Sequence, residues 1–225
     1  MCFSVEADLI AGAAILPIGV LALSRVRAPR ELPFAALPLL FACHQLVEAL
    51  VWAGADGSVG AGTAHTAAVV YVLFALPFLP TFVPVAVLLL ESGRRRQAVV
   101  PFLALGMAVS AYMAWHIAAN GVRVSVHPHA IVYRVGLGDE ELWTGLYVLA
   151  VMGACLVSRH RAVVAFGVVN VVGLSLVAWA YRDAFASLWC LYAAVSSLLV
   201  LVHLAHRPTV ADERRSAGVG TRRDA

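Results

Sequence analysis

The side chains most able to take part in chemistry lie in an apolar segment from Ala42 to Trp52, Ala-Cys-His-Gln-Leu-Val-Glu-Ala-Leu-Val-Trp. We interpret its Glu48 as the only carboxylate that lies well within a membrane span. A charged carboxylate at that depth costs roughly 2.5 to 3.5 kcal/mol, so such a residue persists where it is paired, neutralised or lining a cavity. On a helix, His44, Gln45 and Trp52 lie three or four residues from Glu48, so all four share one stripe. We expect this stripe to face the interior of a helical bundle.

The composition indicates an integral membrane protein. The 225 residues are 62% hydrophobic and 13% charged, with a mean hydropathy of +0.87, whereas soluble domains are about 45 to 50% apolar and about 25% charged. The net charge of +3 does not indicate nucleic-acid binding, because the basic residues form short clusters between apolar runs and no nucleic-acid motif is present. All sixteen Lys and Arg positions are Arg, so no lysine exists for a retinal or pyridoxal Schiff base.

Seven apolar segments are each long enough, at about 20 residues, to cross the hydrocarbon core of a bilayer. They predict an all-α fold: residues 1–206 form a bundle of seven transmembrane helices, and residues 207–225 form a disordered, basic cytoplasmic tail. The segments lie near Ala7–Val26, Leu32–Ala53, Thr63–Leu90, Ala98–Ala119, Leu142–Ser158, Ala162–Tyr181 and Ala184–His206.

The placement of arginines predicts the orientation in the membrane. The connections after the first, third and fifth segments are rich in arginine, as is the tail, whereas the alternate connections carry acidic residues such as Asp56 and Asp139. Arginine-rich connections remain on the cytoplasmic side. We therefore expect the N-terminus outside and the C-terminus inside, in the inner (plasma) membrane.

Two local patterns predict departures from straight helices. Pro77, Pro80 and Pro84 in the third segment remove backbone donors, so this helix should kink or break where its neighbours can satisfy the freed carbonyls. Between the fourth and fifth segments, apolar and polar residues alternate in 122–126 and again in 131–135, as expected of a short hairpin. We expect this hairpin to cap the outer mouth of the bundle.

The expected topology gathers polar residues in the outer half of the bundle. Cys2 and Asp8 precede or open the first segment, His129 belongs to the cap, and Arg182 and Cys190 lie near the start of the seventh segment. A Cys2–Cys190 disulfide is chemically feasible there. The other two cysteines, Cys43 and Cys155, fall within spans and are interpreted as small packing residues.

Several functions remain open for such an outward-facing pocket. The His, Cys and Glu side chains could bind a metal, or Glu48 could serve a membrane-embedded enzyme as acid or base with a thiol from Cys2 or Cys190. The alternative is a transporter in which Glu48 binds a proton or cation. A purely structural role, in which polar groups only hydrogen-bond the helices together, is the fourth interpretation. The partners are the lipid bilayer and a small-molecule or lipid ligand; the sequence specifies no cofactor, metal or oligomeric state.

The opening Met1-Cys2-Phe3-Ser4, followed by Leu32 to Phe41, resembles a family of bacterial multi-pass membrane proteins of unknown function that begin Met-Cys-Phe-Ser. The likeness continues through Gln45-Leu-Val-Glu48 with Trp52, His129-Ala-Ile-Val-Tyr133 and Trp189-Cys190. The resemblance implies a multi-span fold and importance for these polar and aromatic positions. With Glu48, Cys2 and Cys190 as candidate catalytic residues, the candidate ligand-binding residues are Gln45, Trp52, His129, Tyr133, Trp189 and Arg182.

The alternation of arginine-rich and acidic connections predicts the result of a labelling experiment. Cysteines introduced beside Asp56 or Asp139 should react with a membrane-impermeant maleimide in intact cells, whereas one beside Arg94 should react only after permeabilisation. The reverse pattern would overturn the assigned orientation and every depth that depends on it.

Overall fold

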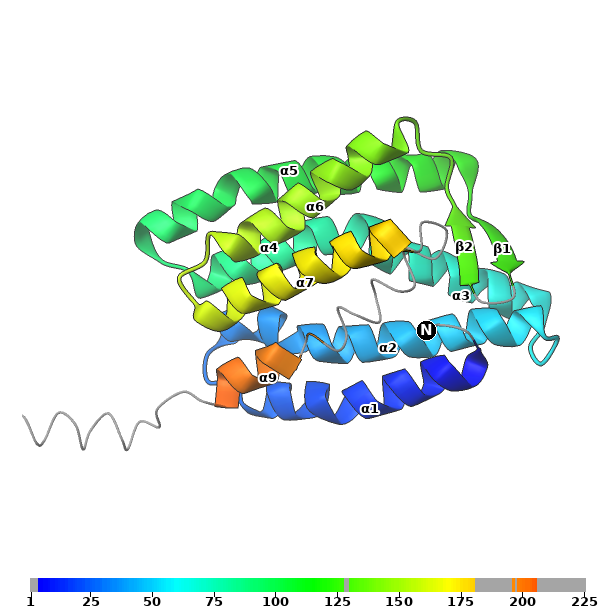
Figure 1. The fold of residues 1–225 in the computed structure, drawn as a ribbon, viewed down its shortest axis with the longest axis horizontal. Coiled ribbons are helices and arrows are strands. Elements are labelled where there is room, and N and C mark those ends of the chain that lie inside the picture. Colours follow the sequence, from blue (N-terminus) through cyan, green and yellow to red (C-terminus); the bar gives the residue numbers. More distant parts are fainter. Residues whose placement is uncertain (1–3, 128–129, 181–195, 197, 206–225) are drawn as a thin grey trace, which may run out of the picture.

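The computed structural model describes residues 4–127, 130–180, 196 and 198–205 (Figure 1). The chain forms long helices, a two-stranded hairpin and short irregular turns. The helices are α1 (Val5–Ser24), α2 (Leu32–Ala55), α3 (Ala61–Leu73), α4 (Leu79–Leu90), α5 (Gly93–Asn120), α6 (Glu140–Leu156), α7 (Arg161–Ala180) and α9 (Leu198–Ala205), with a 3-10 turn η1 (Pro29–Glu31), a π-helical turn η2 (Phe74–Phe78) and strands β1 (Arg123–His127) and β2 (Ala130–Arg134).

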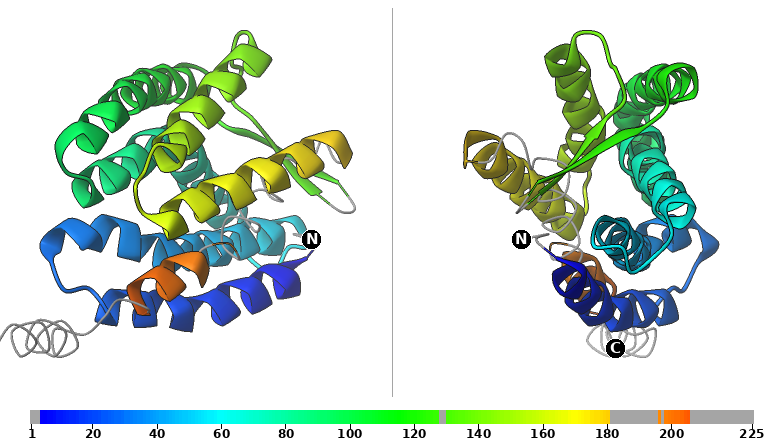
Figure 2. Two further views of the ribbon diagram at one scale, coloured as in Figure 1. Left: turned by 60° about the vertical axis from the view of Figure 1, so that its left-hand side comes forward. Right: turned by 90° about the vertical axis from the view of Figure 1, so that its right-hand side faces the viewer.

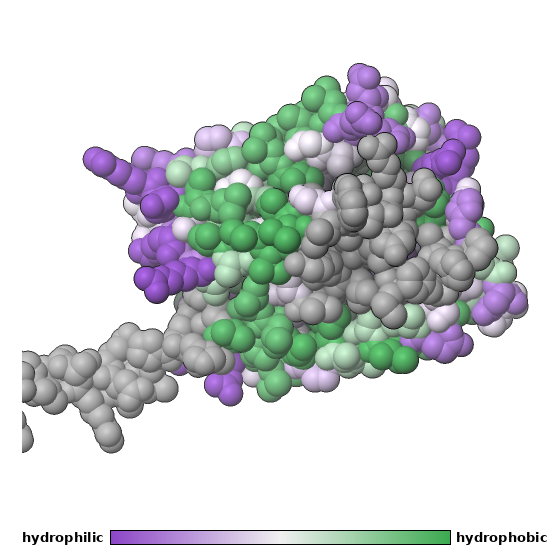
Figure 3. All heavy atoms as spheres, in the orientation of Figure 1, coloured by the Kyte–Doolittle hydropathy of each residue, from purple (hydrophilic) through white to green (hydrophobic). Residues whose placement is uncertain are grey.

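Four helical stretches in the described residues are long and apolar enough to cross a membrane: Val5–Ser24, Pro29–Ala55, Ala61–Leu90 and Gly93–Asn120. They indicate a membrane protein, and Figure 3 shows a broad apolar belt between two hydrophilic ends. Helix α6, with 17 residues, is shorter than these four stretches. In α7, the apolar helical stretch Arg161–Gly173 is also shorter. Most of the seventh predicted segment lies outside the described residues, so a bundle of seven spans remains a prediction.

Helices α1 and α2 are antiparallel and lie side by side (Figure 1). Glycines on α1 let the two helices approach closely. A Cβ atom on Gly12 would lie 2.7 Å from the side chain of Leu46, and one on Gly19 would lie 2.5 Å from the backbone nitrogen of Leu39. The buried face of α1 runs Asp8, Gly12, Ile15, Gly19 and Ala22. This contact fixes which residues of the two helices lie at the same level.

The third predicted segment is interrupted where its prolines begin, as expected. Between α3 and α4 the chain forms the π-helical turn η2, which contains Pro77. A π turn leaves backbone groups outside the regular helical pattern, and such turns are often found at functional sites. The buried hydroxyl of Tyr147 on α6 donates a hydrogen bond of 2.8 Å to the carbonyl oxygen of Ala75 in this turn. The neighbouring helix therefore satisfies the interrupted backbone.

The predicted hairpin is present as strands β1 and β2. The strands pair antiparallel, with Val124 opposite Tyr133 and Val126 opposite Ile131. Ile131 is 1% exposed and packs with Val51 and Trp52 of α2 and with Ala67 and Ala68 of α3. One face of the hairpin therefore covers the adjoining ends of α2 and α3, consistent with the expected cap.

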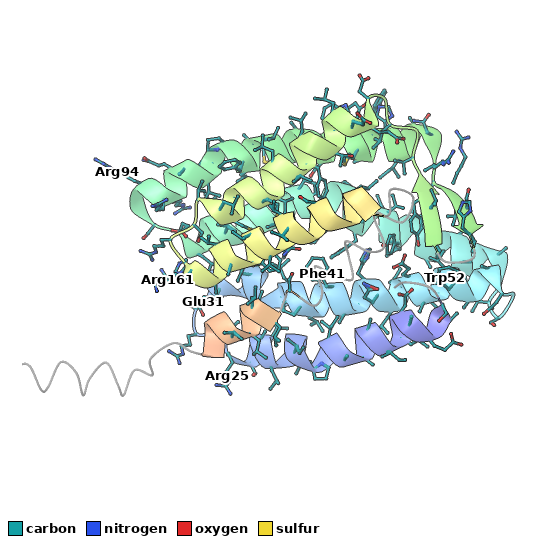
Figure 4. The ribbon with its side chains drawn as sticks, in the orientation of Figure 1. Arg25, Glu31, Phe41, Trp52, Arg94 and Arg161 are labelled. Carbon is teal, nitrogen blue, oxygen red and sulfur yellow. The ribbon has the colours of Figure 1, made fainter. Side chains whose placement is uncertain are left out.

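The connections segregate to two ends of the molecule (Figures 1 and 2). The turns between α1 and α2, between α4 and α5 and between α6 and α7 meet at one end, which we call the arginine end because of Arg25, Arg94 and Arg161 (Figure 4). The α2–α3 connection and the hairpin lie at the opposite end, which we call the hairpin end. The arginine-rich and acidic connections are thus separated in space, as the charge pattern requires.

The two cysteines within the described helices differ from each other. Cys155 is fully buried and packs against Gly167, as expected of a small packing residue. Cys43 is exposed, so its interpretation as a packing residue was wrong. The sequence pattern did not indicate that Cys43 is exposed, because lipid-facing and core-facing positions of a membrane helix are equally apolar.

The close contact between α4 and α5 leads to a stability prediction. A Cβ atom on Gly106 would collide with the carbonyl oxygen of Pro80, whereas Gly145, also inside a helix, has nothing within 4 Å of such an atom. Gly106→Ala should lower the free energy of unfolding by about 1 to 3 kcal/mol because the backbones must separate. The control Gly145→Ala should have little effect in the same denaturation assay. Equal behaviour of the two variants would contradict the α4–α5 packing.

Candidate functional site

The predicted stripe on α2 faces the interior. His44 is 3% exposed, Gln45 and Glu48 are 0% exposed, and Trp52 is 8% exposed. Trp52 packs in a hydrophobic cluster beneath the hairpin. The prediction that the stripe faces the interior is therefore confirmed.

A second buried carboxyl group lies opposite the stripe. Asp8 is in the first turn of α1 and is 0% exposed. Gly12, one turn further along, packs against the side chain of Leu46 and the carbonyl oxygen of Ala42. Because α1 and α2 are antiparallel, this register places Asp8 at the level of Glu48. Asp8 was expected at the opening of the first segment, and the burial of its side chain was not predicted from the sequence.

Local structure explains how Asp8 comes to be buried. The hydroxyl oxygen of Ser4 accepts a hydrogen bond of 3.3 Å from the backbone nitrogen of Ala7, so Ser4 caps α1. The cap starts the helix one turn before Asp8, and Asp8 then falls on the same face as Gly12 and Gly19. The signal in the sequence was the spacing of Asp8 from these two glycines.

Aromatic side chains stack beside the carboxyl groups and join three elements. The ring of His44 on α2 stacks on Tyr71 of α3 at a centroid distance of 4.0 Å, and Tyr71 stacks on Tyr133 of β2 at 4.5 Å. The ring of His44 also contacts that of Phe74, in the π-helical turn, at a centroid distance of 4.5 Å. Tyr133 was predicted as a site residue from the resemblance. Tyr71 was missed, since a single tyrosine in an apolar helix carries no distinctive spacing.

Two nitrogen atoms in this region have no hydrogen-bond partner among the described residues. They are Nε2 of His44 and Nε1 of Trp52. Leaving a buried polar group unsatisfied costs about 1 to 3 kcal/mol. These two nitrogens can therefore contact a further polar group. The residues of this region are Asp8, His44, Gln45, Glu48, Trp52, Tyr71 and Tyr133. We call this set the polar cluster.

A shallow hollow opens at the hairpin end above the polar cluster. Its volume is about 480 Å³, and its lining includes Ser4, Trp52, Asp56, Val126 and His127. Trp52 belongs both to this lining and to the polar cluster, one helical turn from Glu48. The labelled Trp52 in Figure 4 marks this end of α2. The hollow therefore meets the cluster at Trp52.

The rim of the hollow carries a charge. Hydrogen bonds from Ser58 lower the pKa of Asp56 below its ordinary value, and the backbone nitrogen of Ser58 lies 2.8 Å from the Asp56 carboxylate. Asp56 is therefore ionised at neutral pH. The electrostatic effect of this carboxylate favours a ligand with a positively charged or hydrogen-bond-donating group at the mouth.

The structure describes only part of the predicted site. It brings Gln45, Glu48, Trp52 and Tyr133 together in the polar cluster. Five other predicted residues lie outside the described residues: Cys2, His129, Arg182, Trp189 and Cys190. Their place beside Glu48 and the proposed Cys2–Cys190 disulfide therefore remain predictions, as does the disordered tail of residues 207–225. Within the described residues, no group of three or more His, Cys, Asp or Glu side chains is arranged to hold a metal ion.

Comparison with known proteins places the chain in a family. It belongs to a family of unknown function, DUF6629, which matches residues 1–216. No curated protein and no solved structure matches the chain. The family match covers nearly the whole sequence, and no activity is known for the family.

The stacked rings predict how the hairpin is held. Tyr71→Ala should lower the free energy of unfolding by about 3 to 5 kcal/mol, because it removes the ring between His44 and Tyr133. Tyr71→Phe preserves the stack and should stay close to the wild type. Limited proteolysis should cut the hairpin faster only in Tyr71→Ala. Equal protection of the hairpin in both variants would show that the stack does not hold it.

Proposed function

We propose that this protein is a seven-span protein of a bacterial inner membrane that binds a small molecule or lipid in an outward-facing polar site, with Glu48 as its proton-exchanging residue. The observation that carries the proposal is the burial of two carboxyl groups, Asp8 and Glu48, at the same level of two packed membrane helices. Ionisable residues within spans are costly and mark functional sites by default.

The surroundings of Glu48 support a binding site over a purely structural role. A structural cluster needs only that its polar atoms satisfy one another. Nε2 of His44 and Nε1 of Trp52 find no partner in the part of the chain that the structure describes. A ligand with an acceptor atom could take a hydrogen bond from the Trp52 nitrogen, and the His44 nitrogen could donate or accept one according to its tautomer.

The distribution of polar residues along α2 supports a site over a path through the membrane. His44, Gln45 and Glu48 all lie in the half of α2 nearer the hairpin end. Toward the arginine end, the buried face of the same helix presents Phe34, Leu37 and Phe41. The buried polar residues of this helix are therefore confined to the half nearer the hairpin end. A transporter would need polar contacts to continue beyond Phe41, which Figure 4 labels near the middle of α2.

The chemistry available to such a site is acid–base chemistry. A carboxyl group held in a water-poor environment can donate a proton to a bound molecule or accept one from it. In this proposal, Gln45 and Trp52 orient the ligand by hydrogen bonds, and Tyr133 forms part of the wall beneath the hairpin. Cys2, Cys190, His129, Trp189 and Arg182 are proposed to complete the site. If a reaction occurs, Glu48 is the acid or base and Cys2 or Cys190 supplies the thiol.

A pair of carboxyl variants tests the proposal. Glu48→Gln keeps the shape of the side chain and removes its charge and proton. Glu31→Gln is the matched control, because Glu31 is also buried, at 6% exposure, but lies at the arginine end and accepts a hydrogen bond of 3.0 Å from the backbone nitrogen of Arg27. Wild type and Glu31→Gln should retain the same co-purifying molecule, detected by unbiased mass spectrometry.

Glu48→Gln should retain at least about tenfold less of that molecule, since a hydrogen bond to a charged group is worth roughly 1.5 to 3 kcal/mol. Its thermal unfolding should stay cooperative, which separates loss of binding from loss of fold. Equal retention by folded Glu48→Gln would remove Glu48 from the site. A wild-type protein that retains no specific molecule would contradict the binding function.

A further inference from the structure

The arginine end carries a concentrated positive surface formed by two turns. Arg94, Arg95 and Arg96 open α5, and Arg159 and Arg161 flank the start of α7. All five are exposed, and the side chain of Arg159 is 54% exposed. We call these five residues the arginine surface. Figure 4 shows Arg94 and Arg161 at the same end of the molecule.

A buried carboxylate fixes the two turns to each other. The side chain of Glu91, just after α4, is 0% exposed. Its Oε1 accepts hydrogen bonds from the hydroxyl of Ser158 at 2.6 Å and from the backbone nitrogen of Arg159 at 3.0 Å. The Arg159 side chain lies 3.7 Å from the other oxygen, and Nε2 of His160 lies 4.0 Å from Oε1. Glu91 therefore pairs with Arg159, and the other four arginines of the surface form no ion pair among the described residues.

A second contact ties the turns at the surface. The guanidinium group of Arg95 donates a hydrogen bond of 3.1 Å to the carbonyl oxygen of Val157, after α6. Together with the Glu91 contacts, this bond holds the α4–α5 and α6–α7 turns as one unit. The backbone positions of the five arginines are consequently fixed relative to one another, unlike those of arginines on independent connections.

Apolar side chains lie directly beside the arginine surface on the way into the membrane. Val100 on α5 is 50% exposed, Leu156 on α6 is 44% exposed, and Val168 on α7 is 46% exposed. Each lies within about two helical turns of an arginine. A molecule with a phosphate group and long acyl chains fits both parts of this surface, whereas free phosphate would use only the arginines.

We propose that the arginine surface is a binding site for the headgroup of an anionic phospholipid. Guanidinium groups bind phosphate oxygens through paired hydrogen bonds, and basic pockets between membrane helices on the cytoplasmic side bind anionic headgroups. The lipid phosphate contacts the arginines of the two fixed turns, and its acyl chains lie along α5, α6 and α7. This site is separate from the polar cluster and does not depend on the proposed function.

The chain supplies a matched control for charge alone. The α1–α2 turn lies at the same end and carries Arg25 and Arg30, both exposed, and neither belongs to the contacts between the two fixed turns. Arg94→Gln with Arg161→Gln removes two charges from the arginine surface. Arg25→Gln with Arg30→Gln removes two charges from the neighbouring turn. Diffuse attraction to an anionic membrane would weaken equally in both double variants.

The experiment measures binding of phosphatidylglycerol to the full-length protein in detergent by native mass spectrometry, with phosphatidylcholine and inorganic phosphate as the other probes. The wild type should prefer phosphatidylglycerol to phosphatidylcholine. Arg94→Gln/Arg161→Gln should lose roughly 30-fold in affinity, since each arginine near an anionic surface contributes about a factor of five. Arg25→Gln/Arg30→Gln should stay within about twofold of the wild type.

Ser158→Ala provides a second arm that leaves the net charge unchanged. It removes the 2.6 Å hydrogen bond to Glu91 and should weaken phosphatidylglycerol binding severalfold because the turns lose their fixed arrangement. Equal losses in the two double variants would overturn the site in favour of diffuse attraction. No preference over phosphatidylcholine would overturn it as well, and competition by inorganic phosphate at equal concentration would show that the acyl chains make no contribution.

Discussion

The burial of carboxyl groups between membrane helices is the constraint on which the rest of this structure depends. In a bilayer, polar side chains have no water to satisfy them, so the protein itself must provide their surroundings. Asp8 and Glu48 meet this requirement at one level of the α1–α2 pair, where Gly12 and Gly19 allow the helices to approach closely. The contacts of Gly12 with Leu46 and of Gly19 with Leu39 set the register that places the two carboxyl groups at this level.

The elements around the α1–α2 pair complete the enclosure. The hairpin covers the ends of α2 and α3 through Ile131, and its Tyr133 extends the ring stack that begins at His44. The π-helical turn brings Phe74 into contact with His44, and Tyr147 donates a hydrogen bond to the carbonyl oxygen of Ala75 in that turn. An irregular helix and a strand pair outside the helical bundle thus have the same effect, which is to enclose one polar region.

The two ends of the molecule use charge differently. At the hairpin end, carboxyl groups are withdrawn from water within the bundle, and Asp56 stays ionised at the rim. At the arginine end, Glu91 is withdrawn between two turns, and the arginines remain exposed. Buried carboxyl groups are therefore important at both ends: Asp8 and Glu48 belong to the candidate site, and Glu91 joins the two arginine-bearing turns.

Much of this fold could be predicted from the sequence because long apolar runs, prolines and alternating residues each indicate a local structure. The break near Pro77 and the hairpin followed from such patterns. The burial of Asp8 was not predicted, because its spacing from Gly12 and Gly19 indicates a shared face but not which helix packs against that face. The exposure of Cys43 was equally hidden, because both the lipid and the protein interior accept apolar residues. Glu48 was identifiable from its residue type alone, since charge is rare in a span.

The most direct test of the account is a double-mutant cycle between Asp8 and Glu48. The free energy of unfolding would be measured for wild type, Asp8→Asn, Glu48→Gln and the double variant. If the two carboxyl groups share one buried site, the effects should be non-additive, with an interaction energy of about 0.5 to 3 kcal/mol. Effects that add within about 0.5 kcal/mol, as expected for separated residues, would contradict the central claim.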